Sequence, residues 1–127
     1  MKGPREHALG LLDKAEHDLV AAEATLSTGR ALDMVCFHAQ QAAEKSLKAL
    51  LALHDVEYPW RHDLAELLDL AKSFAPQIRG LEERIILLTP FAVEVRYDGE
   101  FEPSFSEAVE ALQTATEVYG LVAQIAR

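Results

Sequence analysis

The stretch that decides the fold is residues 32–53, which read LDMVCFHAQQAAEKSLKALLAL. Small and apolar residues recur in it at steps of three and four, the spacing that places side chains on one face of an α-helix. A second apolar row, which includes Cys36, widens that face, so we expect this helix to be the most buried of the chain. It should end before Pro59, because the residue that precedes a proline avoids the helical region.

The same periodicity continues on both sides of this stretch. Between Ala8 and Leu26 the apolar residues follow steps of four and three, and Gly29 is typical of a helix end. After Pro59, Asp63 and Glu66 form a pattern close to a capping box. We expect this pattern to start a third, shorter helix, whose apolar residues are Leu64, Leu67, Leu68, Ala71 and Phe74.

A fourth helix is predicted from Pro76, with Ile78, Leu81, Ile85 and Leu88 on its apolar face. Pro90 should kink or break it, with one or two further turns over residues 91–96. Residues 97–103 contain turn formers and predict a loop. Ser104 and Glu107 form a second capping box, which opens a last helix with apolar residues from Ala108 to Ala126.

Together these segments predict an all-α fold, an up-and-down antiparallel bundle of about five helices in a single domain over residues 1–127. The helical segments are rich in alanine, which leaves narrow apolar stripes. We therefore expect a homodimer that buries one more face, and a monomeric bundle is the alternative.

The charge balance limits the classes of partner. The chain has 12 Lys and Arg against 21 Asp and Glu, a net charge of −9. This charge repels phosphate backbones, so we expect neither DNA nor a membrane surface as partner, although a local basic patch can still bind a nucleotide or a short RNA. One cysteine, no signal segment and no run of about 20 apolar residues predict a soluble, cytoplasmic protein.

Three polar clusters are candidates for a functional site. The first lies in the central helix, where helical geometry places His38, Gln41, Glu44, Lys45 and Lys48 within a sector of roughly 120°. Two lysines one turn apart can hold a phosphate or pair with neighbouring carboxylates. The alternative is a solvated or dimer-facing surface.

The second cluster is residues 58–63, Tyr-Pro-Trp-Arg-His-Asp, just before a predicted helix. The free N–H groups of a helix N-terminus attract anions, and His62 can act as an acid or a base. Alternatively, His62 and Asp63 only cap the helix while Trp60 covers the core.

The third cluster is residues 94–98, Glu-Val-Arg-Tyr-Asp. Arg96 can bind a phosphate or a carboxylate through two parallel hydrogen bonds. A buried structural ion pair with Glu94, Asp98 or an acidic residue elsewhere in the bundle is an equally good interpretation of this cluster.

Other chemistry has little support in the sequence. His7 and His17 are ten residues apart, and the chain has no H-E-x-x-H motif, so we expect no metal site. Walker, dinucleotide-binding and G-x-S-x-G motifs do not occur, and we expect no cofactor. Cys36 falls on the apolar side of its helix, which favours a core residue over a nucleophile.

Three short segments together resemble a known family. Residues 36–50, CFHAQQAAEKSLKAL, resemble the second-helix signature of HEPN domains, the nucleotide-binding class of higher eukaryotes and prokaryotes. Residues 61–64, RHDL, resemble the motif that follows in that family, and residues 95–97, VRY, resemble a motif late in its fold. The order and spacing also match, and the resemblance covers nearly the whole chain.

The resemblance implies an up-and-down helical bundle that is commonly a homodimer. It also implies a genetic neighbour, a minimal nucleotidyltransferase, with which such proteins often form a toxin–antitoxin pair. Two activities are associated with the family. One is metal-independent RNA cleavage by an arginine and a histidine that are separated by four to six residues, and the other is nucleotide binding without cleavage.

The sequence departs from the ribonuclease pattern. Arg96 is the positional candidate for the arginine, but the required spacing leads to Phe101, Glu102 or Pro103. No other arginine of the chain has a histidine at that spacing. Without a histidine, the arginine can bind phosphate but lacks its acid–base partner.

The sequence therefore predicts a non-catalytic module that binds a nucleotide, a minimal nucleotidyltransferase, or both. Its predicted binding residues are Lys45, Lys48, Arg61, His62, Arg96 and Tyr97. One alternative is a ribonuclease toxin in which His62 replaces the missing histidine beside Arg96. By analogy with the family, Tyr97 could also accept a nucleotidyl group from the partner enzyme. The other alternative is a purely structural, dimerising bundle.

Overall fold

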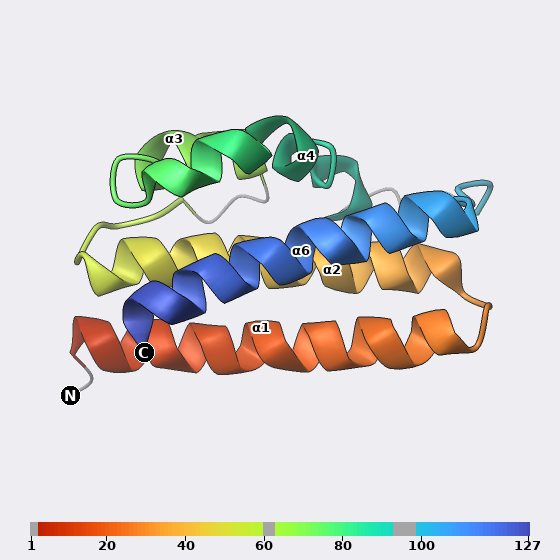
Figure 1. Ribbon diagram of the computed structural model, residues 1–127, viewed down its shortest axis with the longest axis horizontal. Helices are drawn as coiled ribbons and strands as arrows, with labels where there is room; N and C mark the ends of the chain where they lie inside the picture. Colours follow the sequence, from red (N-terminus) through yellow and green to blue (C-terminus); the bar gives the residue numbers. More distant parts are fainter. Residues whose placement is uncertain (1–2, 60–62, 93–98) are drawn as a thin grey trace.

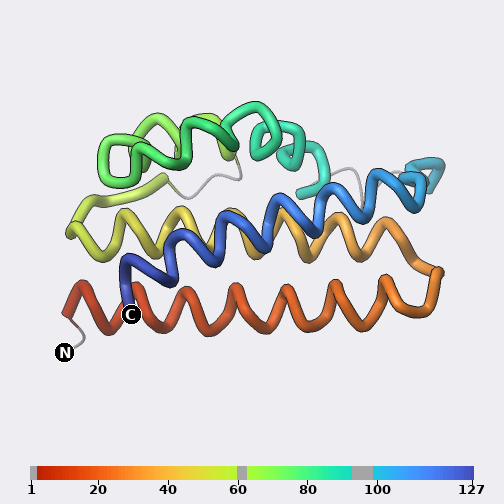
Figure 2. Tube along the Cα trace, viewed as in Figure 1, coloured from red at the N-terminus to blue at the C-terminus, as the bar shows by residue number. Residues whose placement is uncertain are grey.

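Three long helices run along the molecule, and a layer of short helical segments packs alongside two of them, α2 and α6 (Figure 1). The computed structural model describes residues 3–59, 63–92 and 99–127. The long helices are α1 (Pro4–Ser27), α2 (Leu32–Leu53) and α6 (Phe105–Ala126), and each contacts the other two. The trace runs along the bundle in alternating directions, so the predicted all-α, up-and-down fold is confirmed (Figure 2).

The ends of α1 and α2 follow from local sequence. Gly29 directly follows the cap of α1 and has a φ of +69°, a left-handed conformation that glycine adopts without strain. At the end of α2 the N–H of Val56 donates to the carbonyl of Leu51 (2.9 Å), and the N–H of Asp55 donates to that of Ala52 (3.0 Å). These two bonds form a Schellman motif, which ends α2 before Pro59 as predicted.

The short layer begins with α3 (Leu64–Ala71), which Asp63 caps by accepting a hydrogen bond from the N–H of Ala65 (3.0 Å). The sequence predicts that this helix extends to Phe74, but in the structure Phe74 lies beyond its end. The Phe74 ring stacks on that of His54, with ring centroids 4.2 Å apart. Residues 72–74 form a turn, and the chain cannot resume the helix at Ala75 because Pro76 forces its predecessor out of the helical region: Ala75 has φ −148° and ψ 83°.

The predicted fourth helix is wrong as a continuous element. The structure has two 3-10 helices on either side of one short α-helix: η1 (Pro76–Leu81), α4 (Glu82–Ile86) and η2 (Thr89–Ala92). Gly80 weakens the first turns, and Pro90 lacks the N–H that a continuous helix would need. A 3-10 helix repeats every three residues, so the predicted apolar face survives the break. Three of its four predicted residues are buried, namely Ile78, Ile85 and Leu88.

The chain then returns along the bundle as α6. The Ser104 hydroxyl accepts a hydrogen bond from the N–H of Glu107 (3.1 Å), and the Glu107 carboxylate accepts one from the N–H of Ser104 (3.0 Å). The predicted capping box is therefore confirmed. Residues 99–103 form no helix, as predicted, while residues 93–98 lie outside the described residues.

The core is centred on α2, in which 14 of 22 residues are buried. Cys36 is fully buried there, and burial raises the pKa of its thiol to about 12. The thiol is thus protonated at neutral pH, as expected of a core residue rather than a nucleophile. No helix in the described ranges is both long enough and apolar enough to cross a membrane.

Candidate functional site

The candidate site is the polar side of α2, which we call the α2 polar face and define as His38, Gln40, Gln41, Glu44, Lys45 and Lys48. Four of the six predicted site residues, Arg61, His62, Arg96 and Tyr97, lie outside the described residues. The other two, Lys45 and Lys48, both belong to this face. Their ammonium groups pair with different carboxylates.

Asp18 of α1 binds two side chains of the α2 polar face. Lys45 donates from Nζ to Asp18 Oδ2 (2.6 Å), and His38 Nδ1 lies 2.8 Å from Asp18 Oδ1. Because an ionised carboxylate only accepts hydrogen bonds, Nδ1 of His38 carries the hydrogen of this contact. The Asp18 side chain is 11% exposed, whereas those of His38 and Lys45 are 27% and 29% exposed. One buried carboxylate thus orients two partly exposed groups.

Sequence reasoning missed Asp18, although the sequence contains a signal for it. Asp18 lies three residues after Ala15 and four before Ala22, which places it along the apolar stripe of α1. A carboxylate in such a stripe is buried when the helix packs, so it needs a cationic or hydrogen-bonding partner. The spacing alone could not identify that partner.

A second, more buried network lies on the same face. Lys48 donates from Nζ to Glu44 Oε2 (3.1 Å), and Gln40 donates to Glu44 Oε1 (2.9 Å). Gln41 in turn donates to the side-chain oxygen of Gln40 (2.7 Å). The side chains of Lys48 and Glu44 are only 11% and 4% exposed. Lys48 therefore satisfies a buried carboxylate, and little of its charge faces solvent.

Tyr58 connects the first and second predicted clusters. Lys48 Nζ lies 5.4 Å from the centre of the Tyr58 ring, a cation–π contact. The Tyr58 hydroxyl lies 2.8 Å from Nε2 of His7 at the start of α1, and burial raises the pKa of Tyr58. His7 and Tyr58 also line a pocket of about 660 Å³ with Gly3, Pro4 and Val56. Sequence reasoning did not place His7 near this cluster.

We call Asp18, His38 and Lys45 the Asp18 cluster. It is the part of this surface whose polar groups are exposed enough to bind a ligand. In His38, Nε2 is the ring nitrogen that does not contact Asp18. In the neutral ring this atom offers a lone pair, and in the protonated ring it offers a second N–H. Lys45 has two further N–H groups besides the one bound to Asp18. Such donors suit a phosphate or a carboxylate. Within residues 3–59, 63–92 and 99–127, no three His, Cys, Asp or Glu side chains are grouped to hold a metal ion.

Comparisons with known proteins agree with the sequence resemblance. The profile of the HEPN domain matches residues 8–125. A search of curated proteins finds no significant match.

Two solved structures share the arrangement of the helices. The crystal structure of TT1696 from Thermus thermophilus is 28% identical, with a TM-score of 0.80 over 93% of this chain and 97% of that one. The crystal structure of ST0689, described as an archaeal HEPN homologue, is 24% identical, with a TM-score of 0.76 over the whole of both chains. The second likeness concerns the fold alone.

Proposed function

Because this chain belongs to the HEPN domain family, we propose that it is a non-catalytic binding module, built as one domain over residues 1–127. Its proposed ligand is a nucleotide, a minimal nucleotidyltransferase partner, or both, within a toxin–antitoxin pair. The observation that supports the proposal is the Asp18 cluster, in which one buried carboxylate holds Lys45 and His38 at the surface. Groups that are already oriented lose less conformational freedom when a phosphate binds.

The two lysines have different roles in this proposal. Lys45 is 29% exposed and contacts the ligand, while Lys48 is 11% exposed and holds Glu44. Arg61, His62, Arg96 and Tyr97 remain predicted binding residues from the sequence, with Arg96 as the second phosphate contact.

A thermal-shift screen against ATP, GTP, AMP and a short RNA tests nucleotide binding. A ligand at 100 times its dissociation constant should stabilise the fold by about 2.7 kcal/mol. For a domain of this size, that raises the melting temperature by about 10 °C. We expect Lys45→Ala and Arg96→Ala to reduce the shift, while Lys14→Ala, an exposed lysine of α1, leaves it unchanged.

The outcomes of the screen separate the candidate functions. A shift that survives Lys45→Ala and Arg96→Ala places the ligand elsewhere. If no ligand produces a shift, the nucleotide part of the proposal fails. Pull-down of a minimal nucleotidyltransferase by the wild type and by Lys45→Glu then tests the partner alone. RNA that is cleaved in EDTA by the wild type, but not by Arg96→Ala, would favour the ribonuclease alternative.

A structural role is the second candidate, and one observation favours it. Both lysines of the face are paired with carboxylates that are themselves buried. On this interpretation the cluster joins α1 to α2 and binds no ligand. Lys45→Ala would then lower the stability of the protein without changing any binding.

We also propose a homodimer. The proposal is supported by two apolar residues near His38 that a partner copy would cover. Met34 lies one turn before His38 and is 38% exposed, and the ring of Phe37 contacts that of His38 edge-on. Sedimentation velocity of the wild type and of Met34→Asp tests it. A wild type that sediments as a monomer at micromolar concentration would exclude the dimer.

A further inference from the structure

A groove lies on another side of the molecule, between the short layer and the first half of α6. Its volume is about 630 Å³. Leu87, Leu88 and Phe91 line it from the short layer, and Glu107, Glu110 and Ala111 line it from α6. The groove shares no residue with the α2 polar face, so the site proposed above does not account for it.

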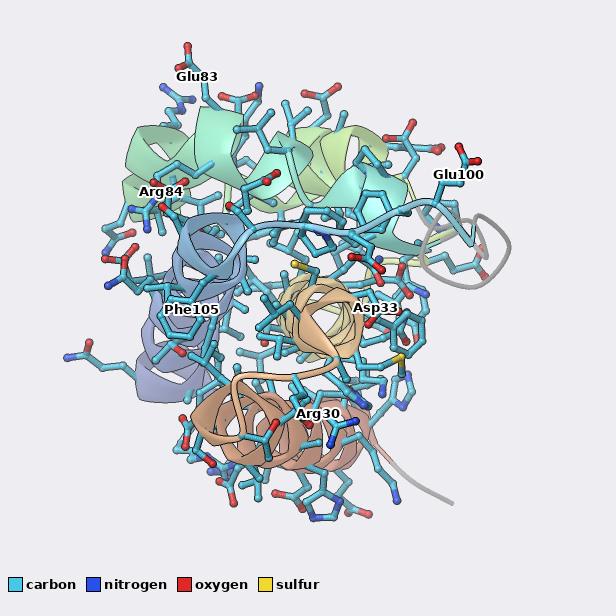
Figure 3. The ribbon with its side chains drawn as sticks, turned by 90° about the vertical axis from the view of Figure 1, so that its right-hand side faces the viewer. Arg30, Asp33, Glu83, Arg84, Glu100 and Phe105 are labelled. Carbon is cyan, nitrogen blue, oxygen red and sulfur yellow. The ribbon has the colours of Figure 1, made fainter. Side chains whose placement is uncertain are left out.

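The short-layer side of the groove is apolar and open to solvent. Leu87 is 70% exposed, the largest exposed fraction among the large apolar side chains of the described ranges. Phe91, which lines the groove with Leu87, is partly exposed. Phe105 is 53% exposed and does not line the groove, but it projects on the same side of the molecule as Arg84 (Figure 3). Large apolar side chains grouped at a groove mark a surface that a partner covers.

The α6 side of the groove is acidic. Glu107, Glu110 and Glu117 follow steps of three and seven residues, so they lie along one edge of the helix. Among the described residues, Arg84 is the one cation that lines the groove, and it pairs with Glu117 at 2.7 Å between Nη1 and Oε2. The carboxylates of Glu107 and Glu110 therefore leave an excess negative charge beside the apolar floor.

This combination indicates the chemistry of the occupant. If a second copy docked here with its own groove, it would bring the same acidic edge of α6 to the contact, and like charges across an interface are unfavourable. We propose that the groove binds a cationic amphipathic helix from a different protein. Apolar side chains of that helix pack on Leu87 and Phe91, and its Lys or Arg residues pair with Glu107 and Glu110.

The dimensions are consistent with a helix. The ten-residue step from Glu107 to Glu117 corresponds to about 15 Å along α6, or nearly three helical turns. A partner helix of this length presents two or three apolar side chains and as many cations on one face.

The test uses the full chain and a fluorescein-labelled synthetic helix, with leucines on one face and lysines on the other. Fluorescence anisotropy measures its dissociation constant. A peptide with glutamates in place of the lysines should not bind. We expect Glu110→Lys to raise the dissociation constant by about tenfold or more, and Glu6→Lys, the same charge change near the start of α1, by less than about twofold.

Leu87→Asp separates specific binding from general attraction between opposite charges. This variant makes the chain more acidic, so charge attraction alone predicts tighter binding of the cationic helix. The proposal predicts binding that is weaker by about tenfold or more, because the apolar anchor is lost. Leu87 is mainly exposed, so the substitution should leave the fold intact.

Three outcomes would overturn the proposal. The first is no binding of the cationic helix, and the second is equal weakening by Glu6→Lys and Glu110→Lys. The third is a wild-type dimer that Leu87→Asp separates in sedimentation velocity without peptide, which would make a second copy the occupant of the groove.

Discussion

Both faces of α2 contain buried side chains, but the chemistry of these side chains is opposite. On one face Cys36, Ala39 and Leu50 are fully buried among apolar neighbours. On the other face Glu44 and Lys48 are also buried, as a hydrogen-bonded ion pair. Burial of apolar surface is favourable in itself, whereas a buried charge is tolerated only while its partner is present. The polar face should therefore be much less tolerant of single substitutions.

Within the polar face, the two lysines differ in the same way. Lys48 pairs with Glu44, one turn earlier in the same helix, and its side chain is 11% exposed. Lys45 reaches across to Asp18 of α1 and is 29% exposed. The deeper pair belongs to the core, and the shallower pair lies where a ligand can reach it. Four predictions test these two comparisons, between the faces of α2 and between its two lysines.

The largest effect is expected for Lys48→Met. It removes the cation from a buried carboxylate and should lower the free energy of unfolding by about 3 kcal/mol. Urea denaturation at neutral pH measures this change. Adding Glu44→Gln to Lys48→Met should recover most of the loss, because no unpaired charge is then buried. A loss under about 1 kcal/mol for Lys48→Met alone would show that the pair contributes no more than a solvent-exposed ion pair does.

The next largest effect is expected for Asp18→Asn. The substitution keeps the shape of the side chain but removes the charge that holds His38 and Lys45. We expect a loss of about 2 kcal/mol in the free energy of unfolding, again by urea denaturation. Asp13→Asn, which breaks an exposed contact with Arg127, is the matched control and should cost less than about 0.5 kcal/mol. Equal losses for the two variants would contradict the role of Asp18.

The apolar face makes a prediction about pH. Burial raises the pKa of Cys36 from 9.0 to about 12, so above pH 9 the folded state keeps a proton that the unfolded state releases. Stability must then fall as pH rises through the window from 9 to 12, with a loss of about 1.4 kcal/mol by pH 10. Urea denaturation between pH 8 and pH 10 measures the loss, and Cys36→Ala should remove this dependence. An identical slope in both proteins would disprove the assignment.

The smallest effect is expected for Lys45→Met, with a loss of about 1 kcal/mol, because the pair is partly solvated and Asp18 keeps its contact with His38. The same variant should lose nucleotide binding if Lys45 contacts the ligand. Isothermal titration with the nucleotide that gives the strongest thermal shift measures this. Unchanged affinity together with a loss of stability would assign Lys45 to structure alone.

Most of the fold could be predicted because helical periodicity and helix caps are local properties. Gly29 and the Ser104 capping box end and begin helices as the sequence indicates. For the segment from Pro76 to Ala92, the sequence predicted a kink or a break at Pro90, but it did not predict that residues 76–81 form a 3-10 helix. Its apolar spacing of three and four residues fits an α-helix and 3-10 turns equally well, so the spacing alone does not distinguish them. In the structure η1 and α4 contact α6, and η2 contacts α2.

The candidate site was predictable only in part. The spacing of Lys45 and Lys48 places them on one face of α2, but it does not say that one of them is nearly buried. Asp18 is 27 residues from Lys45 in the sequence, and His7 is 51 residues from Tyr58. Contacts over such separations depend on how α1 and α2 pack, which no local pattern encodes.

By itself, the sequence determined the helical class, the ends of the long helices, the central position of α2 and the row of polar residues along it. These features follow from side-chain size, periodicity and hydrogen bonding within a few residues. Only the tertiary structure decided which carboxylate each lysine binds, how deeply each pair is buried, and that an acidic groove with exposed Leu87 lies beside α6. The reason is physical: partners and burial depend on the distances between helices, and these arise only when the whole chain packs.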